Sequence, residues 1–221
     1  MVLESKPAVG FQATCGYHRN MPPSNKYPKG VAKQQELVDV ALKVVAERGY
    51  NGATIVQVAD AAGLSKAGLL HHFRTKEQLF AEVLRRRDDL AVGTWVRERQ
   101  DATVDGAALI AGFVRHNARI PGLVQLFTRL SAEATDEANP AHEFFRERYG
   151  LNGEAAASLF RDMQAARRLP ETIDSDMFAV IIAALLDGLQ LRWLYDPDVD
   201  MAAHIEHFFA VLSANAPEAG S

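Results

Sequence analysis

Apolar residues recur at intervals of three and four positions along most of the chain from residue 33 onward. The first such stripe consists of Leu37, Val40, Ala41, Val44 and Val45. This interval places side chains on one face of a helix, and Gly49, which follows the stripe, is a typical helix stop. No segment shows the two-residue alternation of a half-buried strand. The pattern therefore predicts an all-α fold.

Capping signals divide the next part of the chain into short helices. Thr54 and Gln57 have the capping-box spacing, in which each side chain satisfies a backbone N–H of the other residue. Ser65 is a good N-cap for a third helix that ends near Phe73, and a fourth, long helix begins at Thr75. Two short helices joined by a tight turn, with a helix before them, form a helix-turn-helix, whose second helix enters the major groove of DNA.

Proline, glycine and capping residues punctuate the rest of the chain. Further helices are predicted over 105–120, 121–134, 139–168, 177–195 and 200–214. Residues 1–32, by contrast, contain four prolines and no sustained apolar period, which predicts a flexible arm. We therefore expect three parts: an N-terminal arm over 1–32, a helix-turn-helix DNA-binding domain over 33–80, and a helical ligand-binding and dimerisation domain over 81–221.

Composition and charge agree with this division. The 221 residues are 48% hydrophobic and carry a net charge of -4, which is typical of a soluble globular protein. The single cysteine, Cys15, excludes an intrachain disulfide framework and fits a reducing cytoplasm. Residues 1–80 hold ten Lys and Arg against six Asp and Glu, whereas the remaining residues hold fourteen against twenty-two. A basic end joined to an acidic body indicates that the N-terminal part faces nucleic acid.

The segment TIVQVADAAGLSKAGLLHHFRTKEQLF at 54–80 resembles the DNA-binding signature of the TetR family of bacterial repressors. The resemblance implies that Lys66 and Ala67, in the first turn of the recognition helix, face the bases, where a lysine can donate to guanine and a methyl group can pack on thymine. It implies that Thr54 and Lys76 contact phosphates. The expected DNA contacts are Thr54, Ser65, Lys66, Ala67, Gly68, Leu70, His71, His72 and Lys76.

Two of these positions depart from the family pattern. The family commonly has a threonine or serine at the place of Gly68 and a tyrosine at the place of Leu70. One hydroxyl and one phenol that would contact DNA are therefore missing. His71 can compensate by donating a hydrogen bond to a phosphate or a base, since it is neutral or cationic near pH 7.

The predicted helix over 177–195 is apolar nearly all round, which indicates burial on two sides. Together with the final helix it suits a four-helix interface between two subunits, so we expect a homodimer that binds a palindromic operator with half-sites about 34 Å or more apart. The expected interface residues are Ala183, Leu186, Gln190, Leu194, Ile205, Phe208 and Leu212.

The middle helices are rich in aromatic residues with a few polar ones among them, a composition that suits a small-molecule pocket. Core packing is the alternative interpretation of each aromatic position. The resemblance implies an inducer bound between these helices, of hydrophobic or aromatic character. The candidate ligand-binding residues are Trp95, Phe113, His116, Asn117, Phe127, Phe145, Tyr149, Gln164, Phe178 and Trp193.

Other classes of protein are less well supported. The sequence lacks the GxSxG, HExxH and P-loop motifs, and lacks GxGxxG after a strand, so no enzyme, metal or cofactor is predicted. A helical ligand carrier without DNA binding would leave residues 54–76 unexplained. The sequence thus predicts a cytoplasmic, dimeric, ligand-responsive regulator, most simply a repressor, with DNA and a small molecule as partners and no membrane-spanning helix.

Overall fold

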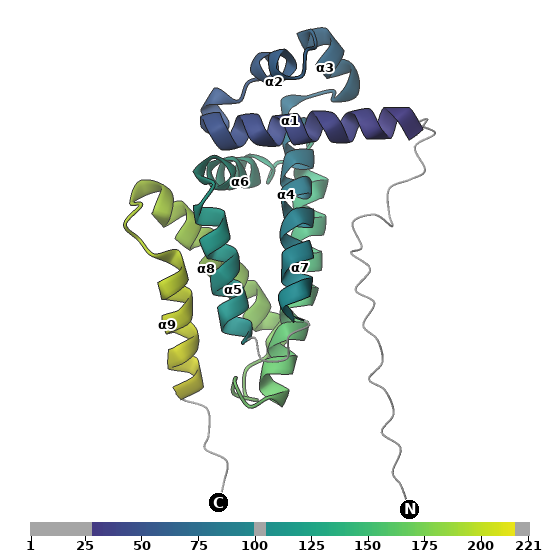
Figure 1. The fold of residues 1–221 in the computed structure, drawn as a ribbon. Helices are drawn as coiled ribbons and strands as arrows, with labels where there is room; N and C mark the ends of the chain where they lie inside the picture. Colours follow the sequence, from purple (N-terminus) through teal and green to yellow (C-terminus); the bar gives the residue numbers. More distant parts are fainter. Residues whose placement is uncertain (1–27, 100–104, 215–221) are drawn as a thin grey trace, which may run out of the picture.

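The computed structural model describes residues 28–99 and 105–214, although not the side chains of residues 28, 29 and 91–99. The described part of the chain contains helices and no strands, as predicted (Figure 1). The helices are α1 (Pro28–Gly52), α2 (Ile55–Ala61), α3 (Lys66–His72), α4 (Lys76–Arg99), α5 (Gly106–Ala118), α6 (Pro121–Glu133), α7 (His142–Ala165), α8 (Ser175–Tyr195) and α9 (Met201–Ala214).

The first helix differs from its prediction at its start. It begins at Pro28, inside the stretch 1–32 that the sequence suggested as an arm, because a proline suits the first turn of a helix. Residues 1–27, which include Cys15, lie outside the described residues. The predicted stop at Gly49 is visible as a break, since Gly49 has a φ of 68° and is not helical. Glycine adopts this left-handed conformation without the steric cost of a Cβ.

Two hydrophobic cores hold the helices together. The first contains buried residues of the four helices α1, α2, α3 and α4. It also includes the inner face of α6, with Phe127, and the beginning of α7, with Phe145. The second joins α5, α7, α8 and α9 around Phe160. The first core therefore extends across the domain boundary expected near residue 80, and it attaches the helix-turn-helix to the body.

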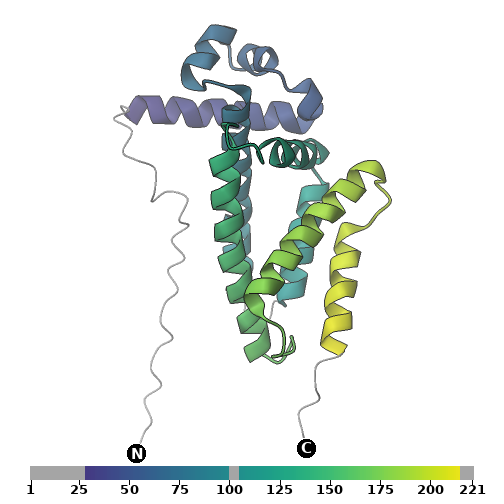
Figure 2. The same ribbon diagram turned by 180° about the vertical axis from the view of Figure 1, so that it is seen from behind.

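The helix-turn-helix lies at one end of the molecule. In Figure 1, α1 lies across that end, with α2 and α3 beyond it and α6 crossing below it, and Figure 2 shows the same arrangement from behind. The principal packing pairs are α1 with α6, α7 with α8, and α5 with α9. α6 is thus the layer between the helix-turn-helix end and the body.

One helix has the length and composition of a membrane span, although the sequence analysis predicted none. Within the described residues, α8 is long and apolar enough to cross a membrane by length and composition alone. One such helix is weak evidence, because core helices of soluble proteins pass the same criterion. α8 packs on α7 through one side, where Phe178, Ala179 and Ile182 are buried.

Candidate functional site

The two short helices of the helix-turn-helix are fixed by the predicted caps. The Thr54 hydroxyl accepts the backbone N–H of Gln57 at 3.3 Å, and Gln57 Oε1 accepts the Thr54 backbone N–H at 3.0 Å. Ser65 Oγ accepts the backbone N–H of Gly68 at 3.0 Å at the start of α3. Gly63, in the turn between the helices, has a φ of 67°, which favours glycine. These contacts confirm the helix-turn-helix geometry that the spacing predicted.

The recognition helix α3 is anchored through one face and open on the other. Leu69 is fully buried in the first core. Lys66, Ala67 and His71 are exposed, and so are Thr54 and Ser65 at the two N-caps. The remaining expected DNA contacts, Gly68, Leu70, His72 and Lys76, are half-buried. Lys66 and His71 of α3 are therefore exposed to solvent, while Leu69 fixes the helix on the first core.

Contacts with neighbouring helices hold the two ends of this region. Gln34 Nε2 of α1 donates a 3.0 Å hydrogen bond to the carbonyl of His72. The ammonium of Lys76 lies 4.3 Å from the centre of the Tyr50 ring and 5.1 Å from that of Phe80. A cation over an aromatic ring is attracted by the ring's quadrupole. Lys76 is therefore positioned by the protein at the start of α4.

The α1–α6 contact places the helix-turn-helix on the body. Gln125 Oε1 of α6 accepts the backbone N–H of Tyr50 at 3.2 Å, and Arg129 donates to Asn51 Oδ1 at 2.6 Å. The Tyr50 hydroxyl lies 3.4 Å from both carboxylate oxygens of Glu133. Gln125, Arg129 and Glu133 of α6 thus contact the end of α1. The Tyr50 ring there is the one that lies against the Lys76 ammonium.

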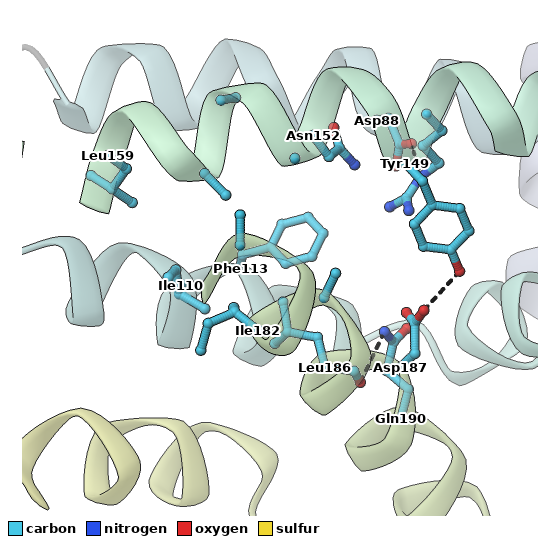
Figure 3. Close-up of a pocket in the computed structure, with 16 residues that line it drawn as sticks. Asp88, Ile110, Phe113, Tyr149, Asn152, Leu159, Ile182, Leu186, Asp187 and Gln190 are labelled. Carbon is cyan, nitrogen blue, oxygen red and sulfur yellow. Dashed lines mark hydrogen bonds and ion pairs between the residues drawn. The ribbon is translucent and has the colours of Figure 1, made fainter. Parts of the chain in front are cut away.

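A pocket opens in the body between α5, α7 and α8, with Asp88 contributed by α4 (Figure 3). Its volume is about 180 Å³, whereas one ordered water needs roughly 10–15 Å³. Apolar side chains form most of the wall, among them Ile110, Phe113, Leu159 and Ile182. The pocket therefore has the apolar lining of a small-molecule site, and its volume, below the roughly 300–1,000 Å³ of drug-sized sites, suits a small ligand.

Two arginines surround a buried carboxylate at the polar end of this pocket. Arg87 Nη2 and Arg148 Nε donate to Asp88 at 2.8 and 2.7 Å, one to each carboxylate oxygen. Burial alone would raise the pKa of the Asp88 carboxyl, but the two guanidinium groups outweigh burial and hold the pKa below its ordinary value. Both arginines also lie over the ring of Phe127, at 5.3 and 4.6 Å. Arg148, which lines the pocket, thereby contacts α6.

A second carboxylate lies opposite, on α8. The Tyr149 hydroxyl donates a 2.7 Å hydrogen bond to Asp187 Oδ2 (Figure 3). Burial raises the pKa of the Asp187 carboxyl, against the lowering effects of this hydrogen bond and of Arg148 and Arg87. Burial, followed by the Asp187 carboxylate, raises the pKa of the Tyr149 phenol as well. The pair connects α7 to α8 beside the pocket.

The structure brings only part of the predicted ligand set to this pocket. Phe113 and Tyr149 line it. Phe127 and Phe145 belong to the first core, and Phe178 packs against Phe160, Phe208 and Phe209 in the second. These three aromatics follow the core-packing alternative, because their rings are enclosed by other rings.

The predicted polar ligand-binding residues His116, Asn117 and Gln164 also lie outside the pocket lining. His116 is exposed, and Asn117 is buried away from the cavity lining. Gln164 donates to the carbonyls of Pro170 and Ile173 and accepts from Ser175. These hydrogen bonds stabilise the loop between α7 and α8. Trp193 packs against the second core from outside the pocket, and the side chain of Trp95 lies outside the described residues.

The sequence analysis did not predict five polar residues that line the pocket: Asp88, Arg148, Asn152, Asp187 and Gln190. Gln190 was predicted at the dimer interface instead. A signal was available for Asp187, which is the one charged residue in the apolar stretch from Met177 to Leu189. Asp88 and Arg148 lie 60 residues apart in charged stretches, where sequence alone does not distinguish a buried pair from a solvated one.

The predicted interface residues face inward in one protomer. Ile205 is fully buried, Leu186, Phe208 and Leu212 pack against the second core, and Ala183 and Gln190 line the pocket. Leu194 is half-buried. The exposed side of α8 is a different stripe, termed here the α8 outer stripe: Met177, Val180, Ile181, Ala184, Gly188, Leu191 and Tyr195. Within one protomer, six of the seven predicted interface residues thus pack on the core or line the pocket, and the α8 outer stripe is exposed.

Comparison with known proteins supports the interpretation of the helix-turn-helix as a DNA-binding unit. The family described as "Bacterial regulatory proteins, tetR family" matches residues 37–83, which include all of α2 and α3. The HTH-type transcriptional repressor Rv1474c of Mycobacterium tuberculosis is 30% identical over 165 residues, which cover 73% of this chain and 82% of the relative. The HTH-type transcriptional repressor KstR2 of Rhodococcus jostii is 34% identical over 93 residues, covering 42% and 45%.

Solved structures share the fold over most of the chain. A TetR-family transcriptional regulator from Agrobacterium tumefaciens has a TM-score of 0.64 at 16% identity, covering 83% of this chain and 98% of the other. A protein from Saccharomonospora viridis, described as a transcriptional regulator and solved in complex with choline, has a TM-score of 0.62 at 23% identity, covering 84% and 97%. These likenesses concern the fold, whereas the match to the M. tuberculosis repressor extends over most of both sequences. The chain belongs to the TetR family of bacterial transcriptional regulators, which are DNA-binding proteins and not enzymes.

Proposed function

We propose that this regulator represses transcription by binding a palindromic operator as a homodimer, and that a small molecule in the α5–α7–α8 pocket releases it. The observation that carries the proposal is the open face of α3, where Lys66, Ala67 and His71 are exposed on a helix whose other face is buried. Its relatives from M. tuberculosis and R. jostii are named repressors. The cytoplasm, where bacterial DNA lies, is the proposed place of action.

In the proposed complex α3 lies in the major groove. Lys66 donates to a guanine and Ala67 packs on a thymine methyl, so these two residues discriminate between bases. Thr54 and the N-terminus of α2 face phosphates, which favour the unpaired N–H groups of a helix start. Lys76 is held by the Tyr50 and Phe80 rings and supplies a positioned charge beside them.

The α8 outer stripe supports the dimer. Apart from the adjacent Val180 and Ile181, its members follow one another at intervals of three and four residues, so they form one apolar face along the whole helix. Ala184 and Gly188 lie at its middle, where small side chains allow two helices to approach closely. Two copies of the same stripe, related by a two-fold axis, bury each other and place two α3 helices on one face of DNA.

The ligand half of the proposal requires that the pocket and α3 are coupled. Arg148, which lines the pocket, lies over the Phe127 ring of α6, and Gln125 of the same helix accepts the Tyr50 backbone N–H at the end of α1. A ligand shifts the operator equilibrium only by its differential affinity for the two states. The choline complex of the S. viridis protein is consistent with a small molecule in a protein of this fold.

Selection of genomic DNA fragments by the purified protein tests the DNA half. We expect enrichment of an inverted repeat, and binding to it that weakens steeply as KCl rises, because phosphate contacts release counterions. A selected pool without a common sequence would contradict the proposal.

The dimer has a separate test. Leu191→Glu places a charge in the α8 outer stripe, whereas Leu90→Glu places one at an equally exposed leucine of α4 (46% and 50% exposed). Sedimentation equilibrium should give a dimer for the wild type and for Leu90→Glu, and a monomer for Leu191→Glu. A dimer that survives Leu191→Glu unchanged would remove the α8 outer stripe from the interface.

A further inference from the structure

The pocket has an apolar body and one polar end, so it is built for an amphipathic molecule. Ile110, Phe113, Leu159 and Ile182 form the apolar part. The polar groups gather where α7 faces α8, and Figure 3 shows Tyr149, Asp187 and Gln190 close together there. The charges at this end decide which head group fits.

Asp88 is already neutralised by the protein. Each of its carboxylate oxygens accepts a guanidinium hydrogen bond, from Arg87 on one side and from Arg148 on the other. The same two guanidinium groups stack on the Phe127 ring. Arg148, the arginine that lines the pocket, is therefore engaged in a buried cluster with Arg87 and Asp88.

Asp187 has a different environment. Among the described residues its hydrogen-bond donor is the Tyr149 hydroxyl, a neutral group. Burial raises the pKa of its carboxyl although Arg148 and Arg87 act in the opposite direction. The ionised carboxylate is thus poorly compensated inside the protein, and a cation brought next to it would stabilise it.

The neighbours of Asp187 also favour a donor of hydrogen bonds. Gln190 uses its Nε2 to donate to the Leu186 carbonyl at 3.3 Å, which leaves its amide oxygen as an acceptor. The Tyr149 hydroxyl donates to Asp187 and keeps acceptor capacity on its oxygen. The aromatic rings of Tyr149 and Phe113 line the same pocket and attract a cation through their faces.

We propose that the ligand of this pocket is a lipophilic amine, whose ammonium group pairs with Asp187 while its apolar part lies along Ile110, Phe113, Leu159 and Ile182. This inference rests on the proposed function, because it takes the pocket to be the regulatory site. It adds the sign of the ligand's charge and the residue that recognises it.

Calorimetric titration with three probes of equal chain length tests the inference. Octylamine, octanol and octanoate are titrated at pH 7, below the concentrations at which they aggregate, into the full-length protein. We expect octylamine to bind at least about tenfold more tightly than octanol, because only the amine pairs with a desolvated carboxylate. Octanoate should bind most weakly, since its charge repels Asp187. Tight binding of octanoate would overturn the inference and assign recognition to the arginines.

Two variants locate the effect. Asp187→Asn keeps an acceptor for Tyr149 and removes the charge, so we expect octylamine to lose its advantage over octanol while octanol affinity stays the same. Asp176→Asn removes an exposed carboxylate of the same helix and should change neither affinity. The wild-type comparison of the three probes remains decisive even if Asp187→Asn folds poorly.

The same three probes, added also to the protein bound to its selected operator, separate this inference from the proposed function. If octanol or octanoate binds and weakens operator binding as well as octylamine does, the amine inference fails and the ligand-released repressor stands. If none of the three binds, the amine inference fails, and operator selection still tests the DNA half by itself.

Discussion

Gly122 of α6 lies directly against the backbone carbonyl of Val45 in α1. A Cβ built on Gly122 would be 2.2 Å from that oxygen and 3.0 Å from the Cα of Gly49. Two helices can approach this closely only where one of them carries no side chain. The contact fixes α6, whose Phe127 lies under the pocket residue Arg148, to the helix that precedes the helix-turn-helix.

Gly122→Ala should therefore separate α1 from α6 and lower the free energy of unfolding by about 1–3 kcal/mol, as overpacking usually does. Gly112 in α5 offers a matched control, since a Cβ there meets nothing within 4 Å. Gly112→Ala should raise the free energy of unfolding by roughly 0.5–1 kcal/mol through the higher helix propensity of alanine. Urea denaturation measures both, and equal effects of the two substitutions would disprove the close contact.

The Asp88 cluster predicts a large loss of stability when its charge is removed. Asp88→Asn leaves Arg87 and Arg148 without their buried counterion and should cost about 3–5 kcal/mol. Asp39→Asn breaks an exposed pair with Arg86, whose side chains are 44% and 43% exposed, and should cost at most about 1 kcal/mol. If chemical denaturation gives similar values for the two variants, the cluster is not a buried ion pair.

The same cluster predicts how stability depends on pH. Because the pKa of Asp88 is lowered by folding, its contribution is present above the ordinary value of 3.8 and is lost as the pH falls through the lower pKa of the folded state. We expect the midpoint of thermal unfolding to fall below about pH 4 in the wild type and to depend less on pH in Asp88→Asn. Parallel curves for the two proteins would contradict this assignment.

Gln125 should transmit the state of the pocket to the DNA-binding unit. Gln125→Ala removes the hydrogen bond to the Tyr50 backbone, and we expect ligand and operator to bind separately as before but to oppose each other less, by about 0.5–2 kcal/mol of coupling. Ser131→Ala is the control, because among the described residues the Ser131 hydroxyl donates to the Thr128 carbonyl of its own helix. Operator affinity with and without a bound ligand, measured by fluorescence anisotropy, gives the coupling. Unchanged coupling in Gln125→Ala would exclude this route.

Lys66 should distinguish operator from other DNA. Lys66→Ala is expected to cost about 1–3 kcal/mol of operator binding and to relax the preference at one base position, as loss of a base contact does. Arg161→Ala removes one positive charge at an exposed position of α7 and should leave both properties unchanged. A uniform loss on operator and random DNA would make Lys66 a phosphate contact instead.

The parts of the fold that depend on neighbouring residues were predictable. The caps at Thr54 and Ser65 depend on residues three positions away, so their spacing revealed the helix-turn-helix. The Asp88–Arg148 pair joins α4 to α7, and no local rule states which of many charges become buried together. α8 is apolar all round, so its periodicity could not show that Gln190 faces the pocket and Leu191 the solvent.

The central claim is that α3 reads DNA for a dimer of this chain. Its most direct measurement is the affinity of the full-length protein for the selected inverted repeat and for a scrambled duplex of the same composition, by fluorescence anisotropy at physiological salt. We expect a preference of about 10³-fold or more for the inverted repeat, with two protomers bound per duplex. Equal affinity for the two duplexes would contradict it.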